Sequence, residues 1–335
     1  MNAPLPRICV IGAGAIGGFF GARLARGHAD VSVVARGRTL EALRERGWVL
    51  ESAGERVVAP VRAVADAAEL GPQDVVIIAV KAYALSDIAP LVTPLLGPSA
   101  VVVPALNGVP WWFTRDATAL PIATRLRSVD PQGLIERHIP APSVLGGVVY
   151  PACSSPEPGV SRHNSGTRVV FGEPGHAAGA APSPRLQAWV DLLKRAGFDA
   201  EASMDIRAEV WKKLLGNACF NPVSMITGSA TDLLIDDAGI YKLFSTMMAE
   251  TLAVGRALGI DVAMQVTDRI ALTRKLGNVK TSMLQDAEAG RPVEIEAILG
   301  AVIEMAEALD VDTPASHTVY TLARMRAKNF GLLKT

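Results

Sequence analysis

The segment that most constrains the fold is the glycine-rich run Gly12-Ala13-Gly14-Ala15-Ile16-Gly17, which has the spacing G-x-G-x-x-G. A short apolar run, Arg7–Ile11, precedes it, and small and apolar residues at helical spacing follow it as far as Arg26. A second apolar run, Val31–Ala35, comes next. In the order strand, glycine turn, helix and strand, this spacing is typical of a fold that binds a dinucleotide. The alternative is an ordinary glycine-rich turn between a strand and a helix.

Each glycine of this run has a separate expected role. Gly12 permits the tight turn, Gly14 lets the backbone approach a pyrophosphate, and Gly17 allows the helix to pack closely on the strand. The N-terminus of the helix then presents N–H groups and a positive dipole end to the phosphates. We therefore expect the whole run from Gly12 to Gly17 to bind the cofactor.

The pattern along the chain predicts two domains. Further apolar runs, among them Val75–Val80 and Ala100–Pro104, alternate with helical segments, which is typical of a parallel sheet covered on both faces. Short strand-like runs between Val144 and Ala202 are expected to extend this sheet, and after Asp205 only helical patterns follow. We predict an α/β fold: an N-terminal Rossmann-type dinucleotide-binding domain with a mostly parallel sheet, residues 1–204, then an all-helical C-terminal domain, residues 205–335.

The residue after the second strand selects the cofactor. Folds of this type that bind NAD usually carry an acid there, which binds the ribose 2′-hydroxyl. This chain has Arg36 at that position, and a guanidinium matches the oxygens of a 2′-phosphate. The prediction is therefore NADP, used as NADPH. The alternative is a solvated surface arginine, and for the nearby Arg38 that alternative is the favoured interpretation.

Two further strand ends point to the same ligand. Lys81 follows Val75–Val80, and Asn107 follows the strand that ends near Pro104. In open α/β sheets, ligands collect at the carboxyl ends of the strands. We expect Lys81 to contact a cofactor phosphate or a substrate carboxylate, and Asn107 to contact the nicotinamide ribose. A surface lysine and a turn-forming Asn-Gly pair are the alternatives.

A polar stripe runs along an otherwise apolar helix in the second domain. Lys213, Asn217 and Asn221 are four residues apart, so they share one helix face. Buried amides and a buried ammonium require partners, and a stripe of them suits a substrate site. The alternative is a lysine that reaches solvent and asparagines bonded to neighbouring helix ends. Farther along, Pro292 and Glu294 are expected in the first turn of a helix, where the carboxylate would complement the helix dipole.

Composition excludes several classes of function. Lys plus Arg and Asp plus Glu both number 33, and this balance argues against binding to nucleic acid or to an anionic membrane. No apolar run approaches the ~18 residues that span a bilayer. The cysteines are far apart, which favours the reducing cytoplasm. No metal site is expected, because no metal-ligand spacing occurs among the histidines His28, His138, His163, His176 and His317.

These motifs, taken together, resemble the ketopantoate reductase (2-dehydropantoate 2-reductase) family. The matching pieces run in family order over nearly the whole chain. They are the Gly12–Gly17 run, Arg36, Val80-Lys81-Ala82, Leu106-Asn107-Gly108, Trp211-Lys212-Lys213-Leu214 with Asn217 and Asn221-Pro222, Ser282-Met283-Leu284-Gln285-Asp286, and Glu294-Ile295-Glu296.

The resemblance implies the reaction and the roles of its residues. Lys213 is the implied general acid, Glu294 the second catalytic carboxylate, and the implied substrate-binding residues are Asn217, Asn221 and Ser282. The expected reaction is the NADPH-dependent reduction of a small 2-oxo acid, with 2-dehydropantoate as the first candidate. The alternatives are a reductase or dehydrogenase of another 2-oxo or hydroxy acid, and a non-catalytic protein that senses NADP. A homodimer is compatible with the sequence.

The chain departs from the family pattern in three places. Val279 stands where an asparagine is often found, the aromatic run Trp111-Trp112-Phe113 follows the Asn107-Gly108 turn, and residues 125–143 look like a long insertion. These features resemble those of a paralogous branch with another substrate. The aromatic run is expected either to pack internally or to shape the pocket for a bulkier acid.

Overall fold

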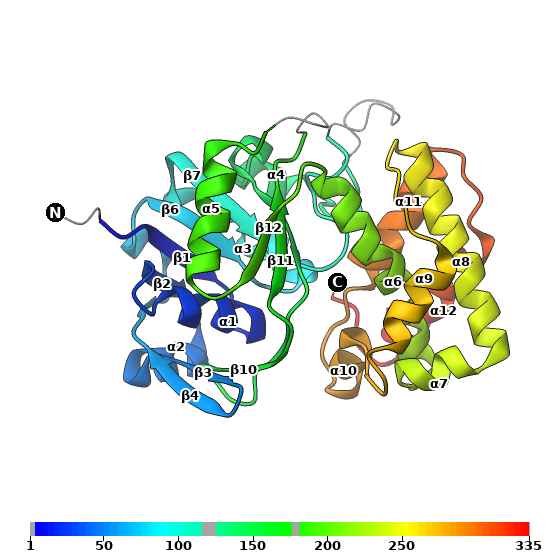
Figure 1. Ribbon diagram of the computed structural model, residues 1–335, viewed down its shortest axis with the longest axis horizontal. Coiled ribbons are helices and arrows are strands. Elements are labelled where there is room, and N and C mark those ends of the chain that lie inside the picture. Colours follow the sequence, from blue (N-terminus) through cyan, green and yellow to red (C-terminus); the bar gives the residue numbers. More distant parts are fainter. Residues whose placement is uncertain (1–3, 116–124, 176–180, 335) are drawn as a thin grey trace. The chain divides into compact units, whose positions relative to one another are not determined.

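The computed structural model describes residues 4–115, 125–175 and 181–334 (Figure 1). The chain divides into two compact units. The first contains Met1–Leu106 and Leu134–Ile206, and the second contains Asn107–Gly133 and Arg207–Thr335. All the strands of the described residues belong to the first unit. The prediction of an α/β N-terminal part followed by a helical C-terminal part is therefore confirmed.

The first unit is built around the strands, which have the following bounds. They are β1 (Arg7–Ile11), β2 (Asp30–Val34), β3 (Trp48–Ser52), β4 (Glu55–Ala59), β5 (Arg62–Val64), β6 (Gln73–Ile78), β7 (Leu96–Pro104), β8 (Gly146–Val149), β9 (Ala152–Ser154), β10 (Val160–Ser165), β11 (Arg168–Gly172) and β12 (Asp199–Ala202).

The central sheet is parallel throughout, with strand order β5-β2-β1-β6-β7. Its middle strand, β1, pairs Cys9 with Ser32 of β2 on one side and with Val76 of β6 on the other. The last four residues of β1 are almost completely buried, which explains their continuous apolar sequence. This arrangement brings the carboxyl ends of β1, β2 and β6 to one edge of the sheet.

The expectation that the strands after Val144 extend this sheet is wrong, because β8 to β12 all belong to other sheets. Strands β8, β11 and β12 form a separate sheet of order β12-β11-β8, joined to the central one by a single parallel bridge between Val102 and Val144. Strands β9 and β10 join β3 and β4 in a third sheet, where β3 and β4 form an antiparallel hairpin. Strand β3 was not predicted from the sequence, and its pairing partner β10 lies about a hundred residues later in the chain.

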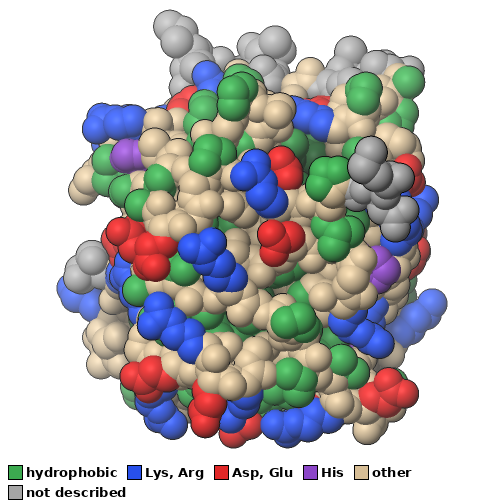
Figure 2. Space-filling model, turned by 90° about the vertical axis from the view of Figure 1, so that its left-hand side faces the viewer, with side chains coloured by type: hydrophobic (Ala, Val, Ile, Leu, Met, Phe, Trp, Pro, Cys, Tyr) green, Lys and Arg blue, Asp and Glu red, His purple; other side chains and the backbone are tan. Residues whose placement is uncertain are grey.

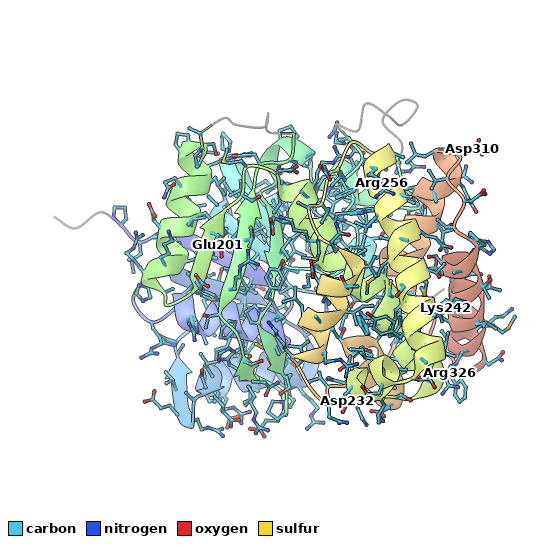
Figure 3. All side chains as sticks on the ribbon, turned by 45° about the vertical axis from the view of Figure 1, so that its right-hand side comes forward. Glu201, Asp232, Lys242, Arg256, Asp310 and Arg326 are labelled. Carbon is cyan, nitrogen blue, oxygen red and sulfur yellow. The ribbon has the colours of Figure 1, made fainter. Side chains whose placement is uncertain are left out.

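The helices of the first unit cover these sheets (Figure 1). They are α1 (Ala15–Leu24), α2 (Gly37–Arg46), α3 (Leu85–Ile88), α4 (Leu134–His138) and α5 (Pro184–Arg195). Helix α1 approaches Trp48 of β3 so closely that a Cβ on Gly21 would lie 2.2 Å from the indole ring. Trp48 is fully buried there, so the glycines of α1 serve packing as well as the turn. On β12, Glu201 pairs with Arg168 at 2.7 Å (Figure 3).

The second unit is helical in its described residues. Its helices are α6 (Ile206–Thr227), α7 (Thr231–Asp236), α8 (Ala238–Ala257), α9 (Val266–Arg274), α10 (Ser282–Glu288), a π-helical turn η6 (Glu296–Gly300), α11 (Ala301–Ala308) and α12 (Pro314–Asn329). Helix α6 runs through Pro222 and continues to Thr227. Burial on both sides of the proline, at Phe220 and Val223, explains why the helix continues despite the lost hydrogen bond. At α7, Asp232, which is labelled in Figure 3, accepts hydrogen bonds from Asn278.

The segment Asn107–Gly133 groups with the helical unit, although it precedes the predicted boundary near Ser203–Asp205. Glu304 of α11 holds it through the backbone N–H groups of Arg127 and Ser128, at 2.7 and 2.9 Å, and through the Ser128 hydroxyl at 2.6 Å. The division into domains at residues 204 and 205 stays a prediction.

The surface carries both signs of charge. On the face shown in Figure 2, basic and acidic side chains are interspersed, as the equal numbers in the sequence suggest. Among the described helices, none combines the length and the apolar character needed to cross a membrane.

Candidate functional site

Two glycines of the N-terminal turn are required by packing within the chain. Gly12 has a φ of +104°, and a Cβ there would lie 2.6 Å from the carbonyl oxygen of Ala79. A Cβ on Gly17 would lie 1.9 Å from the carbonyl oxygen of Gly12. Both positions therefore exclude any other residue, and the turn holds β1, α1 and the residues after β6 together.

Gly14 differs from both, because no contact within the chain excludes a side chain there. Its φ of −83° suits any residue, and a Cβ there would have no atom within 4 Å. Gly14 is the exposed N-cap of α1, and no side chain caps the first-turn N–H groups of that helix. The open space and the uncapped helix end fit a dinucleotide phosphate, which would approach the backbone at this point.

The two basic residues that are expected to bind the dinucleotide follow the strands on either side of β1. Arg36 is exposed at the N-cap of α2, two residues after β2, and its side chain makes no hydrogen bond or ion pair in the described part of the chain. Lys81 is partly buried and stands two residues after Ala79, whose carbonyl lies against Gly12. Both side chains therefore come from backbone positions close to the glycine turn.

In the second unit, Lys213 of α6 meets the residue that follows β7. The Lys213 Nζ donates a hydrogen bond of 2.8 Å to Oδ1 of Asn107. From the sequence, these two residues were assigned separately to substrate and to cofactor. No pattern in the sequence could have joined them, because they are 106 positions apart and belong to unrelated elements.

Burial and one nearby carboxylate set the acidity of Lys213. Burial disfavours the charged ammonium and lowers the pKa of Lys213 to about 8, while the negative charge of Glu294 opposes that shift and raises it. Glu294 is only 6% exposed. It stands just before the helix that starts at Ile295, so the expectation that Pro292 and Glu294 lie inside the first turn is wrong. The chain remains extended through Val293, whose N–H is bonded to Leu332 O instead of entering a helix.

The residues expected to bind substrate have polar groups that the protein itself does not use. The side chains of Asn217, Asn221 and Ser282 have no hydrogen bond among the described residues, although Asn221 is only 5% exposed. Asn217 and Asn221 share the Lys213 face of α6 by their spacing. Ser282 is the first residue of α10, next to the N-cap Thr281. No hydrogen bond in the described part joins Ser282 to the α6 stripe.

The aromatic run after Asn107 packs internally. Trp111, Trp112 and Phe113 are buried, and Phe113 stacks on Trp211 of α6 with ring centroids 5.6 Å apart. The guanidinium of Arg207 lies 5.2 Å from the centre of the Phe113 ring. These contacts favour the packing interpretation of the run over a pocket for a bulkier acid.

The described residues contain no group of three or more His, Cys, Asp or Glu side chains that could hold a metal ion. His176, one of the histidines considered in the sequence, lies outside the described residues.

Comparisons with known proteins match the chain over nearly its whole length. The family model "Ketopantoate reductase PanE/ApbA" matches residues 8–176, and the corresponding C-terminal model matches residues 205–327. A 2-dehydropantoate 2-reductase of Mesorhizobium japonicum is 43% identical over 97% of this chain and 99% of its own.

Solved structures give the same result. A protein of Ralstonia solanacearum, proposed to be a ketopantoate reductase, matches with a TM-score of 0.92 and 45% identity over 98% of this chain and 99% of its own. A D-mandelate dehydrogenase bound to NADH and anilino(oxo)acetate matches with a TM-score of 0.82 at 21% identity, over 98% of this chain and all of its own, which is a likeness of fold alone. The chain therefore belongs to the ketopantoate reductase family, and it is an oxidoreductase that uses a nicotinamide dinucleotide.

Proposed function

We propose that the protein reduces a small 2-oxo acid with NADPH, and that 2-dehydropantoate, reduced to pantoate, is the first candidate. The observation that carries this proposal is the Lys213 ammonium, which is bonded to Asn107, lies in the field of Glu294 and has its pKa lowered to about 8. A lysine in that range releases its proton far more readily than a surface lysine, and it remains mostly charged at neutral pH.

The chain's own residues divide the chemistry as follows. When bound, NADPH supplies the hydride that reduces the carbonyl carbon. Lys213 Nζ stabilises the negative charge that develops on the carbonyl oxygen and donates a proton to it. Glu294 keeps the lysine charged between turnovers, because its carboxylate raises the pKa of Lys213. The products are the 2-hydroxy acid, the oxidised cofactor NADP⁺ and a neutral lysine, which water then reprotonates.

The substrate-binding residues suit a small monoacid. Asn217, Asn221 and Ser282 offer neutral donors and acceptors, which fit one carboxylate and one hydroxyl better than a multiply charged group. A site that bonds the terminal hydroxyl of 2-dehydropantoate rejects an analogue that lacks it, because its own polar groups would be left without partners. The buried aromatic run adds no argument for a bulky acid.

The cofactor residues favour NADPH. The run Gly12–Gly17 would hold the pyrophosphate, Arg36 the 2′-phosphate, and Lys81 a phosphate or the substrate carboxylate. The Asn107 amide nitrogen can donate to the nicotinamide ribose while its oxygen accepts from Lys213. We further propose a cytoplasmic location, which the free thiols of Cys9, Cys153 and Cys219 favour, and a homodimer in solution.

A substrate panel tests the reaction itself. We expect kcat/KM for 2-dehydropantoate to exceed the value for 2-oxoisovalerate, its analogue without the hydroxyl, by about a hundredfold or more. The measurement is NADPH oxidation at 340 nm with these two acids and an aromatic 2-oxo acid. If the aromatic acid is preferred by more than about tenfold, the substrate assignment is wrong and the reductase assignment stands. If none of the three acids is reduced while NADPH binds, the proposed substrate class is wrong.

Replacement of Lys213 tests the general acid. Lys213→Ala should lower kcat by roughly 10²–10⁴-fold, the usual contribution of a positioned acid, and leave NADPH affinity nearly unchanged. The matched control is Lys212→Ala on the same helix, because Lys212 pairs with Glu209 at 2.6 Å and has no proposed role in the reaction. A Lys213→Ala enzyme that keeps most of its activity would remove the residue from the mechanism.

The pH dependence of the reaction follows from the pKa of Lys213. Because the ammonium is the proton donor, kcat/KM for reduction should be level below the pKa of about 8 and fall tenfold per pH unit above it. Glu294→Gln removes the charge that raises this pKa, so the descending limb should move to lower pH. A limb that stays in place in the Glu294→Gln enzyme would contradict the assigned coupling.

Arg36 should set the preference for NADPH over NADH. A charge-assisted hydrogen bond to phosphate contributes roughly 1.5–3 kcal/mol, or about tenfold to a hundredfold in affinity. Arg36→Asp should abolish or reverse the preference, whereas Arg38→Asp, the matched control in the first turn of α2, should leave it largely intact. The ratio of the two kcat/KM values measures it, and equal use of both cofactors by the unmutated protein would refute the assignment.

A further inference from the structure

The helix that follows Glu294 begins with the π-helical turn η6, and this turn releases one carbonyl group. In an α-helix, the N–H of Ala301 would donate to the carbonyl of Ala297, four residues earlier. Here the Ala301 N–H donates to Glu296, five residues earlier. The carbonyl of Ala297 is thus available, and it accepts a hydrogen bond of 2.8 Å from the backbone N–H of Val109. Single π-turns within helices are frequent at functional sites.

Gly108 makes this contact possible for two separate reasons. Its φ is +83°, which L side chains rarely adopt. In addition, a Cβ there would lie 2.5 Å from the carbonyl oxygen of Ala297 and 2.8 Å from its carbon. Because these are backbone atoms of Ala297 and not the end of a flexible side chain, they cannot rotate away. A side chain at Gly108 would therefore displace the Asn107-Gly108-Val109 turn from η6.

We propose that Gly108 and the π-turn η6 are positioning elements for proton transfer, which hold the Asn107 amide oxygen against the Lys213 ammonium. The order of contacts is continuous: Ala297 binds Val109, two residues from Asn107, and Asn107 binds Lys213 at 2.8 Å. The same turn fixes the backbone of Glu294, whose carbonyl accepts from Ile298 N–H at 3.1 Å. This inference rests on the proposed role of Lys213 as the acid.

The Asn107 amide is a neutral contact of Lys213, unlike the charged side chains nearby. Glu294 acts on Lys213 through its field. On the same helix, Glu209 is paired with Lys212 at 2.6 Å, and the Arg207 guanidinium lies over the Phe113 ring. Asn107 therefore provides a neutral acceptor, which favours the charged form of the lysine and orients its protons.

The first experiment measures the pKa of Lys213 directly, from the pH titration of its ε-carbon signal by NMR. Asn107→Ala and Gly108→Ala should each lower this pKa, by roughly half to one unit, because the ammonium loses the Asn107 acceptor. The double variant should show no further shift, because both changes remove the same hydrogen bond. The matched control is Gly259→Ala, since Gly259 also has a positive φ, +73°, but a Cβ there would meet no atom within 4 Å. That control should leave the pKa unchanged.

The second readout is catalysis. Gly108→Ala should lower kcat for the 2-oxo acid by about tenfold or more, with little change in KM, and should move the descending limb of the pH profile to lower pH. The Gly259→Ala enzyme should match the unmutated one. If Gly108→Ala leaves both the pKa and kcat unchanged, or if its effects add to those of Asn107→Ala, the proposal is overturned.

A measurement on the unmutated protein covers the case in which Gly108→Ala does not fold. The Val109 amide should exchange its hydrogen slowly, because its N–H is bonded to Ala297 in a buried position. Rapid exchange at Val109 would overturn the proposal. The pKa titration needs no turnover, so its pattern tests the positioning role even if the protein reduces no 2-oxo acid. A lack of 2-oxo acid reduction would refute only the proposed function.

Discussion

The buried ammonium of Lys213 is the constraint around which the helical unit is organised. A charge removed from water is unfavourable unless acceptors and opposite charges replace the lost hydration. Burial accordingly lowers the pKa of Lys213, and Glu294 raises it part of the way back. The balance leaves the group protonated at neutral pH but able to give up its proton. If nearby groups fully replaced the lost hydration, Lys213 would be as weak an acid as a surface lysine. If they replaced none of it, Lys213 would be neutral.

The groups that compensate Lys213 come from segments far apart in the chain, and rigid packing keeps them in place. Asn107 follows the last strand of the parallel sheet, and Glu294 immediately precedes the helix that contains η6. The stacking of Phe113 on Trp211 fixes the segment after Asn107 to the same helix that carries Lys213. Trp211 is itself anchored by a hydrogen bond from its indole N–H to the carbonyl of Thr251. Close-packed aromatic side chains resist gradual deformation. The packing of Phe113 on Trp211 therefore helps to keep Asn107 and Lys213 at a fixed separation.

The sequence predicted the parts of the fold that local patterns determine. The parallel strands β1, β2, β6 and β7 were evident from continuous apolar runs, and the polar stripe on α6 from its spacing. Strand β3 was missed although it forms a local hairpin with β4. Strand β10 was placed in the wrong sheet, because its partner β3 lies about a hundred residues away. The Asn107–Lys213 hydrogen bond and the π-turn depend on tertiary packing in the same way. Their only trace in the sequence is the Asn107-Gly108 pair, which also fits an ordinary turn.

The glycines of the chain separate what the fold requires from what a ligand requires. At Gly12, Gly17 and Gly108 a Cβ would collide with backbone oxygens, so the folded chain alone explains why no side chain is present. Gly14 is different, since it has an ordinary φ and open space around it. Glycine is acceptable at the N-cap of a helix, so the fold tolerates Gly14 without requiring it. Gly14 is therefore the position of the turn at which the proposed dinucleotide phosphate would approach the backbone without displacing a side chain.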